Sequence, residues 1–238
     1  MIYKYYGPPG TGKTYRLISR ARAYQRIGTR LDRIGYFAFT RKAAKEARER
    51  MPVSDKKLPY FQTFHSFAYK TLQLKEENVM QPVHYELLGK RLGIRVSYTD
   101  KYNEEESTYL TCNNPYFQLI NRAINKNIDI EEVFIDEAQD LSPLQWKLYD
   151  KIKETTKDIY LAGDDDQAIF AWAGADVKKF IIEEAKEKVL KKSKRVSQVV
   201  QAAATSPITK IRGIKFNKTY EPRSYKGTAQ YISNLGQV

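Results

Sequence analysis

The sequence predicts an α/β fold in which helices cover a parallel sheet. Three observations lead to this prediction. Short apolar runs alternate with segments of helical pattern, the order expected of βαβ units. A glycine-rich stretch, GPPGTGKT at residues 7–14, lies between the first apolar run and the first helical pattern. Two later apolar runs are each followed directly by acidic residues.

The expected elements follow in chain order. Strands are predicted at 2–6, 34–39, 60–63, 132–135 and 158–162, and helices at 13–27, 41–51 and about 65–74. Residues 75–115 break the alternation with polar stretches and a short helical piece around 83–92, so we expect there an inserted subdomain or a long excursion between strands of the sheet. From about residue 205, prolines, glycines and weak periodicity predict a tail that is loosely packed or part of something larger.

Composition excludes several classes of protein. The chain has 238 residues, 42% of them hydrophobic, which is enough for a packed core. The single cysteine, Cys112, excludes an internal disulfide and a cysteine-based zinc site. The sequence shows neither a signal peptide nor an apolar run long enough to span a membrane. We therefore expect a cytoplasmic protein, of a bacterial cell or a phage-infected host, without a membrane partner.

Positive charge gathers at both ends of the chain. The net charge is +13, with 13 Lys and Arg against 3 acidic residues in 1–50 and 12 against 2 in 186–238. Two basic ends around an acidic centre indicate a surface that binds a polyanion. A solvated, lysine-rich surface would give the same pattern.

The glycine-rich stretch matches the phosphate-binding loop G-x-x-x-x-G-K-[ST]. Its glycines let backbone N–H groups turn toward phosphate oxygens, and the next helix adds its positive N-terminus. Lys13 would reach the β- and γ-phosphates of ATP, and Thr14 would hold Mg²⁺. The predicted nucleotide-binding residues in this loop are Gly7, Gly10, Thr11, Gly12, Lys13 and Thr14.

Two later segments supply groups for ATP hydrolysis. In VFIDEAQD, Asp136 at a strand end can hold Mg²⁺ through water, and Glu137 can orient and deprotonate an attacking water. A glutamate at this point favours water over a substrate hydroxyl, and so an NTPase over a small-molecule kinase. In LAGDDDQAIFAWAGAD, Gln167 follows a strand and can contact the γ-phosphate.

Aromatic and polar residues near other strand ends suit contact with a single nucleic-acid strand. Trp172 could stack on a base or else pack in a core, and Phe39 offers a second ring. Phosphate and base contacts are expected from Thr40, Arg41, Thr63 and His65. A lone histidine such as His65 could equally be structural.

Together, GPPGTGKT, AFTRKAAKEARER, TFHSFA, FIDEAQDLS and GDDDQAIFAWAGA resemble, in this order, the motifs of the UvrD/Rep/PcrA family of superfamily 1 DNA helicases. The resemblance covers residues 6–176. It implies two RecA-like P-loop NTPase domains with ATP between them, single-stranded DNA across the top and 3′-to-5′ movement. The first RecA-like domain would comprise 1–74 and 116–186, a shortened 1B-like subdomain 75–115, and the incomplete beginning of the second domain 187–238.

The resemblance adds two residues to the site and shows departures from the family. VLKKSKRVSQVVQAAA is similar to motif IV, which implies that Arg195 reaches the γ-phosphate, although Lys194 replaces a tyrosine. Tyr15 takes the place where relatives put an arginine against adenine. Ala173 replaces an arginine, which affects coupling between the sites. Nothing after residue 205 resembles motifs V and VI.

The expected function is the ATP-binding and ATP-hydrolysing part of a 3′-to-5′ DNA translocase or helicase in repair or replication. Its partner would be single-stranded DNA or a 3′-tailed duplex, and a second chain could carry the missing half. This chain alone would hydrolyse ATP weakly and unwind nothing. The alternatives are a truncated, non-hydrolysing module that binds ATP and single-stranded DNA, and a P-loop ATPase acting on a protein.

Overall fold

A computed structural model describes residues 1–72, 123, 128–171, 174–211 and 213–228. Six strands form one all-parallel sheet in the order β3-β2-β4-β5-β1-β6. The strands are β1 (Ile2–Tyr6), β2 (Ile34–Phe37), β3 (Phe61–Gln62), β4 (Glu132–Ile135), β5 (Asp158–Gly163) and β6 (Lys186–Val189). The predicted α/β fold is confirmed, and it is that of a RecA-like P-loop domain.

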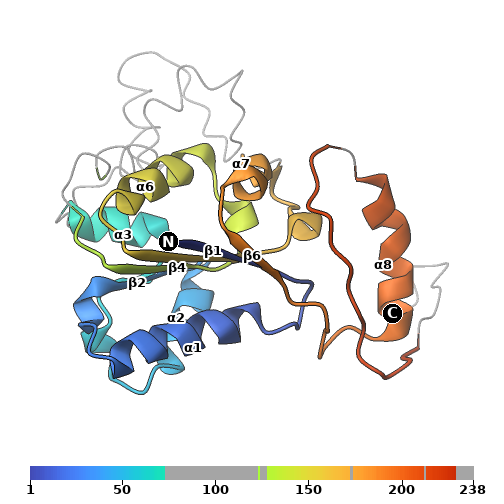
Figure 1. The fold of residues 1–238 in the computed structure, drawn as a ribbon, viewed down its shortest axis with the longest axis horizontal. Coiled ribbons are helices and arrows are strands. Elements are labelled where there is room, and N and C mark those ends of the chain that lie inside the picture. Colours follow the sequence, from blue (N-terminus) through green and yellow to red (C-terminus); the bar gives the residue numbers. More distant parts are fainter. Residues whose placement is uncertain (73–122, 124–127, 172–173, 212, 229–238) are drawn as a thin grey trace, which may run out of the picture.

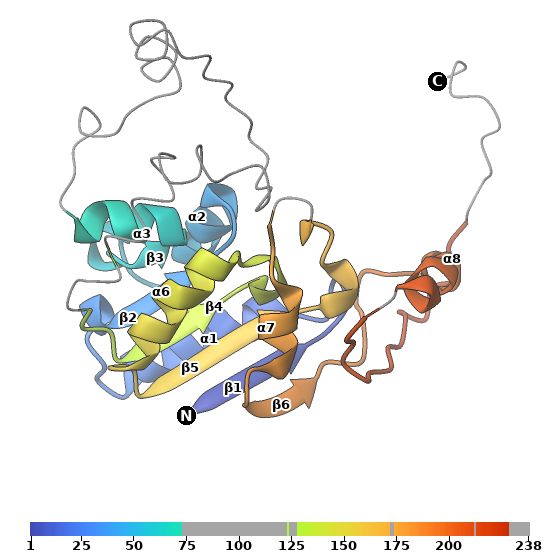
Figure 2. The same cartoon turned by 90° about the horizontal axis from the view of Figure 1, so that it is seen from above.

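Helices cover both faces of the sheet. They are α1 (Lys13–Arg26), α2 (Arg41–Glu49), α3 (Phe64–Thr71), α6 (Pro143–Lys153), α7 (Val177–Ile182) and α8 (Gln198–Lys210). Helices α1 and α2 lie on one face and α3, α6 and α7 on the other, whereas α8 stands apart from the sheet (Figures 1 and 2). No helix in the described part of the chain is long and apolar enough to cross a membrane.

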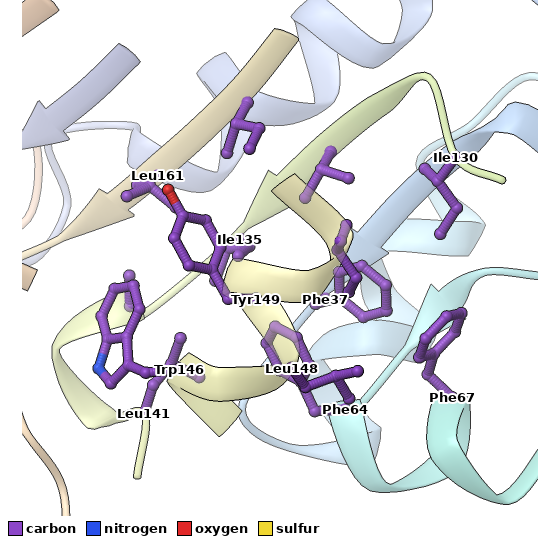
Figure 3. Packing of buried hydrophobic residues seen from close by; sticks show 14 of the residues in the cluster. Phe37, Phe64, Phe67, Ile130, Ile135, Leu141, Trp146, Leu148, Tyr149 and Leu161 are labelled. Atoms are coloured by element: carbon purple, nitrogen blue, oxygen red, sulfur yellow. The ribbon is translucent and has the colours of Figure 1, made fainter. Parts of the chain in front are cut away.

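The hydrophobic core has two parts, one on each face of the sheet, because successive residues of a strand point to opposite faces. In β1, Tyr6 joins the cluster under α3, α6 and α7, while Tyr5 joins the cluster under α1 and α2. Figure 3 shows the first cluster, in which Phe37 of β2 packs against Phe64 of α3 with ring centroids 4.6 Å apart. A sheet buried on both faces explains why its strands are apolar runs and do not alternate with polar residues.

Strand β6 extends the sheet beyond the range expected for the first domain. It pairs with β1, with Tyr3 opposite Lys186 and Tyr6 opposite Val189. The buried Lys4 of β1 forms an ion pair of 3.0 Å with Glu187 of β6. The expected boundary between 186 and 187 therefore falls inside a strand of the main sheet.

Other differences from the sequence expectations concern the second half of the chain. The predicted strands, and the helices predicted at 13–27, 41–51 and about 65–74, are present within about three residues of their predicted ends, but α6, α7, β6 and α8 were not predicted. The inserted subdomain at 75–115 lies outside the described residues. The tail, expected to be loosely packed or part of something larger, is anchored to the body of the protein at two points: the Lys218 side chain is only 2% exposed and Phe216 stacks on Tyr6. Neighbouring residues of the tail, such as Ile214, are exposed.

A buried carboxyl group at the amino end of β4 makes stability depend on pH. Glu132 is 4% exposed and lies opposite Asp158 of β5. Burial, together with the charge of Asp158, raises the pKa of Glu132 from its ordinary 4.5 to about 7. The folded protein thus holds a proton that the unfolded chain releases. The stability that this group contributes is present below pH 4.5 and is lost as the pH rises through 7.

Glu132→Gln should therefore stabilise the protein at pH 8, by on the order of 2 kcal/mol, because glutamine resembles the protonated acid. The advantage should largely vanish at pH 4.5. Urea unfolding at both pH values measures the difference. Glu49→Gln, on the exposed end of α2, is the matched control and should change little at either pH. An equal effect of Glu132→Gln at both pH values would contradict the assignment.

Candidate functional site

The loop between β1 and α1 has the conformation that a phosphate-binding loop needs. Gly10 and Gly12 have φ of 79° and 89°, in the left-handed region that favours glycine. Gly12 is also the N-cap of α1, so the loop runs directly into the positive end of a helix. Lys13, the first residue of that helix, is 7% exposed, and its Nζ donates to the Gly7 carbonyl oxygen over 2.6 Å. These features place backbone N–H groups and one ammonium around the same small space.

Thr14 and Asp136 meet across the sheet edge, as the sequence interpretation requires. Thr14 Oγ1 donates to Asp136 Oδ2 over 2.6 Å, although the two residues are 122 positions apart. Tyr36 of β2 donates its hydroxyl to the same carboxylate oxygen over 3.0 Å. A hydroxyl and a carboxylate are oxygen ligands of the kind that Mg²⁺ prefers. These two side chains would hold the ion, which when bound would neutralise charge on phosphate oxygens.

Glu137 follows Asp136 in a strained backbone conformation. Its φ of 53° makes it the one non-glycine residue with positive φ in the part of the chain that the structure describes. Such a conformation costs about 1–3 kcal/mol and is found preferentially at functional sites. It turns the chain from β4 into the short helix η5 (Ala138–Asp140).

Gln139 is a site residue that the sequence interpretation missed. Its Nε2 donates to Glu137 Oε2 over 3.1 Å and to Asp140 Oδ2 over 3.0 Å. Its Oε1 accepts from the backbone N–H of Asp164 over 3.1 Å. Gln139 therefore links the end of β4 to the end of β5. Burial, followed by the charge of Glu137, raises the pKa of Asp140 to about 7.

Gln167 lies in the short helix η6 (Asp165–Gln167), directly after β5. Its Nε2 donates to Asp164 Oδ2. Burial raises the pKa of Asp164, and the positive charge of Lys13 is among the influences that oppose this rise. The charge of Lys13 in the phosphate loop therefore acts on the carboxylate that binds Gln167.

The segment after β6 touches the outside of the phosphate loop. Ser193 Oγ donates to the Pro9 carbonyl over 2.6 Å, and the Lys194 N–H donates to the Gly10 carbonyl over 2.9 Å. Arg195 packs so closely that a Cβ atom added to Gly10 would lie 2.4 Å from its Cβ. Glycine is thus required at this position by its neighbour as well as by its φ. The side chain of Arg195 is exposed beside the loop.

Among the residues expected to contact nucleic acid, Phe39 is the best placed. It is 37% exposed after β2, and its ring lies 5.1 Å from that of Phe170, which follows η6. The segments after β2 and after η6, which are distant in sequence, thus bring one pair of aromatic rings together. Trp172 and Ala173 lie outside the described residues.

The polar residues of this group have different surroundings. Thr40 and Thr63 are N-caps, whose hydroxyls accept from the N–H groups of Ala43 and Ser66. Arg41 is exposed at the start of α2. Burial lowers the pKa of His65, so this imidazole is neutral at pH 7. Tyr15 is 70% exposed on the first turn of α1.

All these groups follow carboxyl ends of parallel strands. Ligands of open α/β sheets bind at this edge. Hydrogen bonds through Gln139 and Asp164 connect Thr14, Asp136, Glu137 and Gln167 into one network. Lys13 bonds instead to the Gly7 carbonyl of the phosphate loop, and Arg195 lies against Gly10 of the same loop. Within the described residues no group of three or more His, Cys, Asp or Glu is arranged to hold a metal by itself.

Comparison with known proteins gives relatives among DNA helicases. A probable DNA helicase of Mycoplasma pneumoniae is 27% identical over 278 aligned positions, covering 87% of this chain and 53% of that protein. A probable DNA helicase II homolog of Mycoplasma capricolum is 25% identical, covering 70% of this chain and 32% of that protein. The ATP-dependent DNA helicase Rep of Buchnera aphidicola is 37% identical over 54 residues, 23% of this chain and 8% of Rep.

The chain spans about half the length of the Mycoplasma pneumoniae relative. Among solved structures, the PRRSV helicase aligns with 94% of this chain and 36% of its own, at a TM-score of 0.47 and 13% identity. Residues 2–173, well over half of the chain, match the AAA domain family. The chain therefore belongs to the AAA domain family, and it is a distant homologue of DNA helicases of the Rep and helicase II kind.

Proposed function

We propose that this chain is the ATP-binding and ATP-hydrolysing part of a translocase that moves 3′ to 5′ on single-stranded DNA. One observation carries the proposal. The phosphate loop, the Thr14–Asp136 pair and the Phe39–Phe170 ring pair all follow strand ends at the same edge of one sheet. A nucleotide and a nucleic-acid strand could therefore bind close enough for each to influence the other. The direction of movement is inferred from the resemblance to the UvrD/Rep/PcrA family.

The residues divide the work of hydrolysis between them. Lys13 would bind the terminal phosphates, and Thr14 and Asp136 would hold Mg²⁺. Glu137 would accept a proton from the attacking water, and Gln167 would contact the γ-phosphate. Positive charge delivered to the γ-phosphate is typically worth 10³–10⁵ in rate, and Arg195 is the candidate for this role. Because its side chain is exposed, we expect residues 1–238 alone to hydrolyse ATP weakly and not to unwind duplex DNA.

The DNA half of the proposal is tested with Phe39→Ala. Loss of one stacking ring should weaken binding to single-stranded DNA by about 1–3 kcal/mol, with little dependence on sequence. It should also reduce any stimulation of ATP hydrolysis by DNA. Fluorescence anisotropy with labelled oligonucleotides at several salt concentrations measures the affinity, which should fall as salt rises.

Ile27→Ala is the matched control, because Ile27 is 78% exposed at the far end of α1 from the phosphate loop. It should leave DNA affinity unchanged. Thermal denaturation of both variants shows whether Phe39→Ala acts through stability. DNA binding without ATP hydrolysis would support a non-hydrolysing module. ATP hydrolysis with no affinity for DNA would contradict the proposal and favour an ATPase that acts on a protein.

A further inference from the structure

The tail strap, defined here as residues 214–221, lies against the ends of β1 and β5. The ring of Phe216 stacks on that of Tyr6, the last residue before the phosphate loop, with centroids 3.8 Å apart. The backbone N–H of Phe216 donates to Asp165 Oδ2 over 3.0 Å. In Figure 1 the chain after α8 runs back between that helix and the body of the sheet. The strap thus touches β1 just before the phosphate loop and the segment that follows β5.

Lys218 of the tail strap is buried among three consecutive aspartates. Its side chain is 2% exposed, and its ammonium forms an ion pair with Asp165 as well as pairs of 3.4 Å with Asp164 and 3.0 Å with Asp166. Burial alone would lower the pKa of Lys218, but its bonds to these carboxylates outweigh burial and raise it. The lysine is therefore charged at neutral pH, and it compensates carboxylates that would otherwise repel one another.

Two residues of the strap also contact the Asp164 carboxylate. The hydroxyl of Tyr220 donates to Asp164 Oδ1 over 2.9 Å, and Lys218 pairs with the same oxygen. The other oxygen, Oδ2, accepts from the side chain of Gln167. The terminal torsion of an aspartate is soft, so a carboxylate without fixed partners samples many orientations. Because Tyr220 and Lys218 bind Oδ1 of Asp164, its Oδ2 is directed toward the side chain of Gln167.

We propose that Lys218 and Tyr220 are positioning residues, which hold the Asp164 carboxylate in the orientation that fixes the side chain of Gln167. In this role Asp164 acts through its bond to Gln167, whereas Asp165 and Asp166 pair with Lys218. The importance of a fixed Gln167 rests on the proposed function, since Gln167 acts there on the γ-phosphate. The contacts of Tyr220 and Lys218 with Asp164 are present in the protein without nucleotide. They can therefore be tested independently of ATP hydrolysis.

Hydrogen exchange in the protein without nucleotide tests whether Lys218 and Tyr220 stabilise the segment around Asp164. The N–H of Asp166 donates to Asp164 Oδ1, and that of Gln167 to the Asp164 carbonyl. Tyr220→Phe removes one hydroxyl and keeps the ring, so amides 166–169 should exchange about ten-fold faster, as expected for loss of a hydrogen bond to a carboxylate. Tyr225→Phe, a tyrosine 57% exposed on the same tail, is the matched control and should change nothing. Unchanged exchange in Tyr220→Phe would overturn the inference.

Single-turnover hydrolysis of ATP tests whether the hold acts through Gln167. Tyr220→Phe should lower the rate constant by about ten-fold while the Kd for nucleotide stays the same, since positioning affects the reacting geometry. In a Gln167→Ala background the same substitution should have no further effect. Equal effects in the two backgrounds would show that Tyr220 acts elsewhere and would overturn the inference.

The two measurements separate failure of the inference from failure of the proposed function. If the parent chain neither binds nor hydrolyses ATP, the proposed function is wrong, and the exchange experiment alone decides whether the strap holds the loop. Lys218→Met provides a second variant, with Lys226→Met on the exposed tail as its control. It should accelerate exchange of the same amides more than Tyr220→Phe does, because Asp164 and Asp165 then lose their ion-pair partner, while Asp166 keeps only Lys215. Exchange unaffected by Lys218→Met would also count against the proposal.

Discussion

Lys13→Ala is expected to lower affinity for ATP by about 10²–10³-fold, since truncating one partner of a buried charge pair costs about 2–5 kcal/mol. The ammonium of Lys13 is buried beneath the phosphate loop and bonded to the Gly7 carbonyl. It is the charge best placed to meet terminal phosphates, because the loop and the first turn of α1 surround it. Titration with a fluorescent ATP analogue in the presence of Mg²⁺ measures the loss.

Two comparisons make this result specific. Lys45→Ala removes a lysine that is 67% exposed on α2 and should leave the affinity unchanged. Circular dichroism and thermal denaturation show whether Lys13→Ala still folds. A folded Lys13→Ala protein with parental affinity would mean that the loop does not bind nucleotide as proposed.

Among the described residues up to 163, every strand and α-helix except α6 was predictable because local signals and tertiary structure agree there. Each strand is an apolar run of the length that a sheet buried on both faces demands. Helix α6 was missed although its start is marked in the sequence: Ser142 and Gln145 form a capping box, with Pro143 at the first position of the helix. Strand β6 carries no such mark, since KEKV is an edge strand with mostly exposed residues.

The candidate site was predictable to the level of strand ends, because parallel strands bring their carboxyl ends to one edge. Local sequence therefore located Thr14 and Asp136, which are in contact. It could not identify Gln139, whose importance comes from bonds to both Glu137 and the backbone of Asp164. Nor could it identify Lys218. From sequence alone, a lysine in a basic tail is expected to be solvated. Its burial beside Asp165, which is more than 50 positions away, depends on the tertiary structure.

Glu137→Gln is expected to keep nucleotide binding and to lower the rate of hydrolysis by about 10²–10⁴-fold, the usual contribution of a general base. Glutamine has the shape of glutamate but cannot accept a proton from water. The carboxylate lies at the edge of the site, with one oxygen bonded to Gln139. The strained backbone at Glu137 fixes where the side chain starts. Hydrolysis is best measured with protein in excess over ATP, so that a slow reaction of the chain alone remains visible.

Asp136→Asn is the informative comparison, because the two acidic residues are adjacent but have different proposed tasks. Asp136 contacts Thr14 and Tyr36, so its loss should weaken binding of ATP in the presence of Mg²⁺, whereas Glu137→Gln should not. Glu154→Gln, on an exposed residue at the end of α6, controls for the change of charge. If Glu137→Gln bound ATP as the parent does and also hydrolysed it at the parental rate, another group would have to accept the proton. Asp140 would be the first candidate, because Gln139 bonds to its carboxyl group as well and its pKa of about 7 suits a general base at neutral pH.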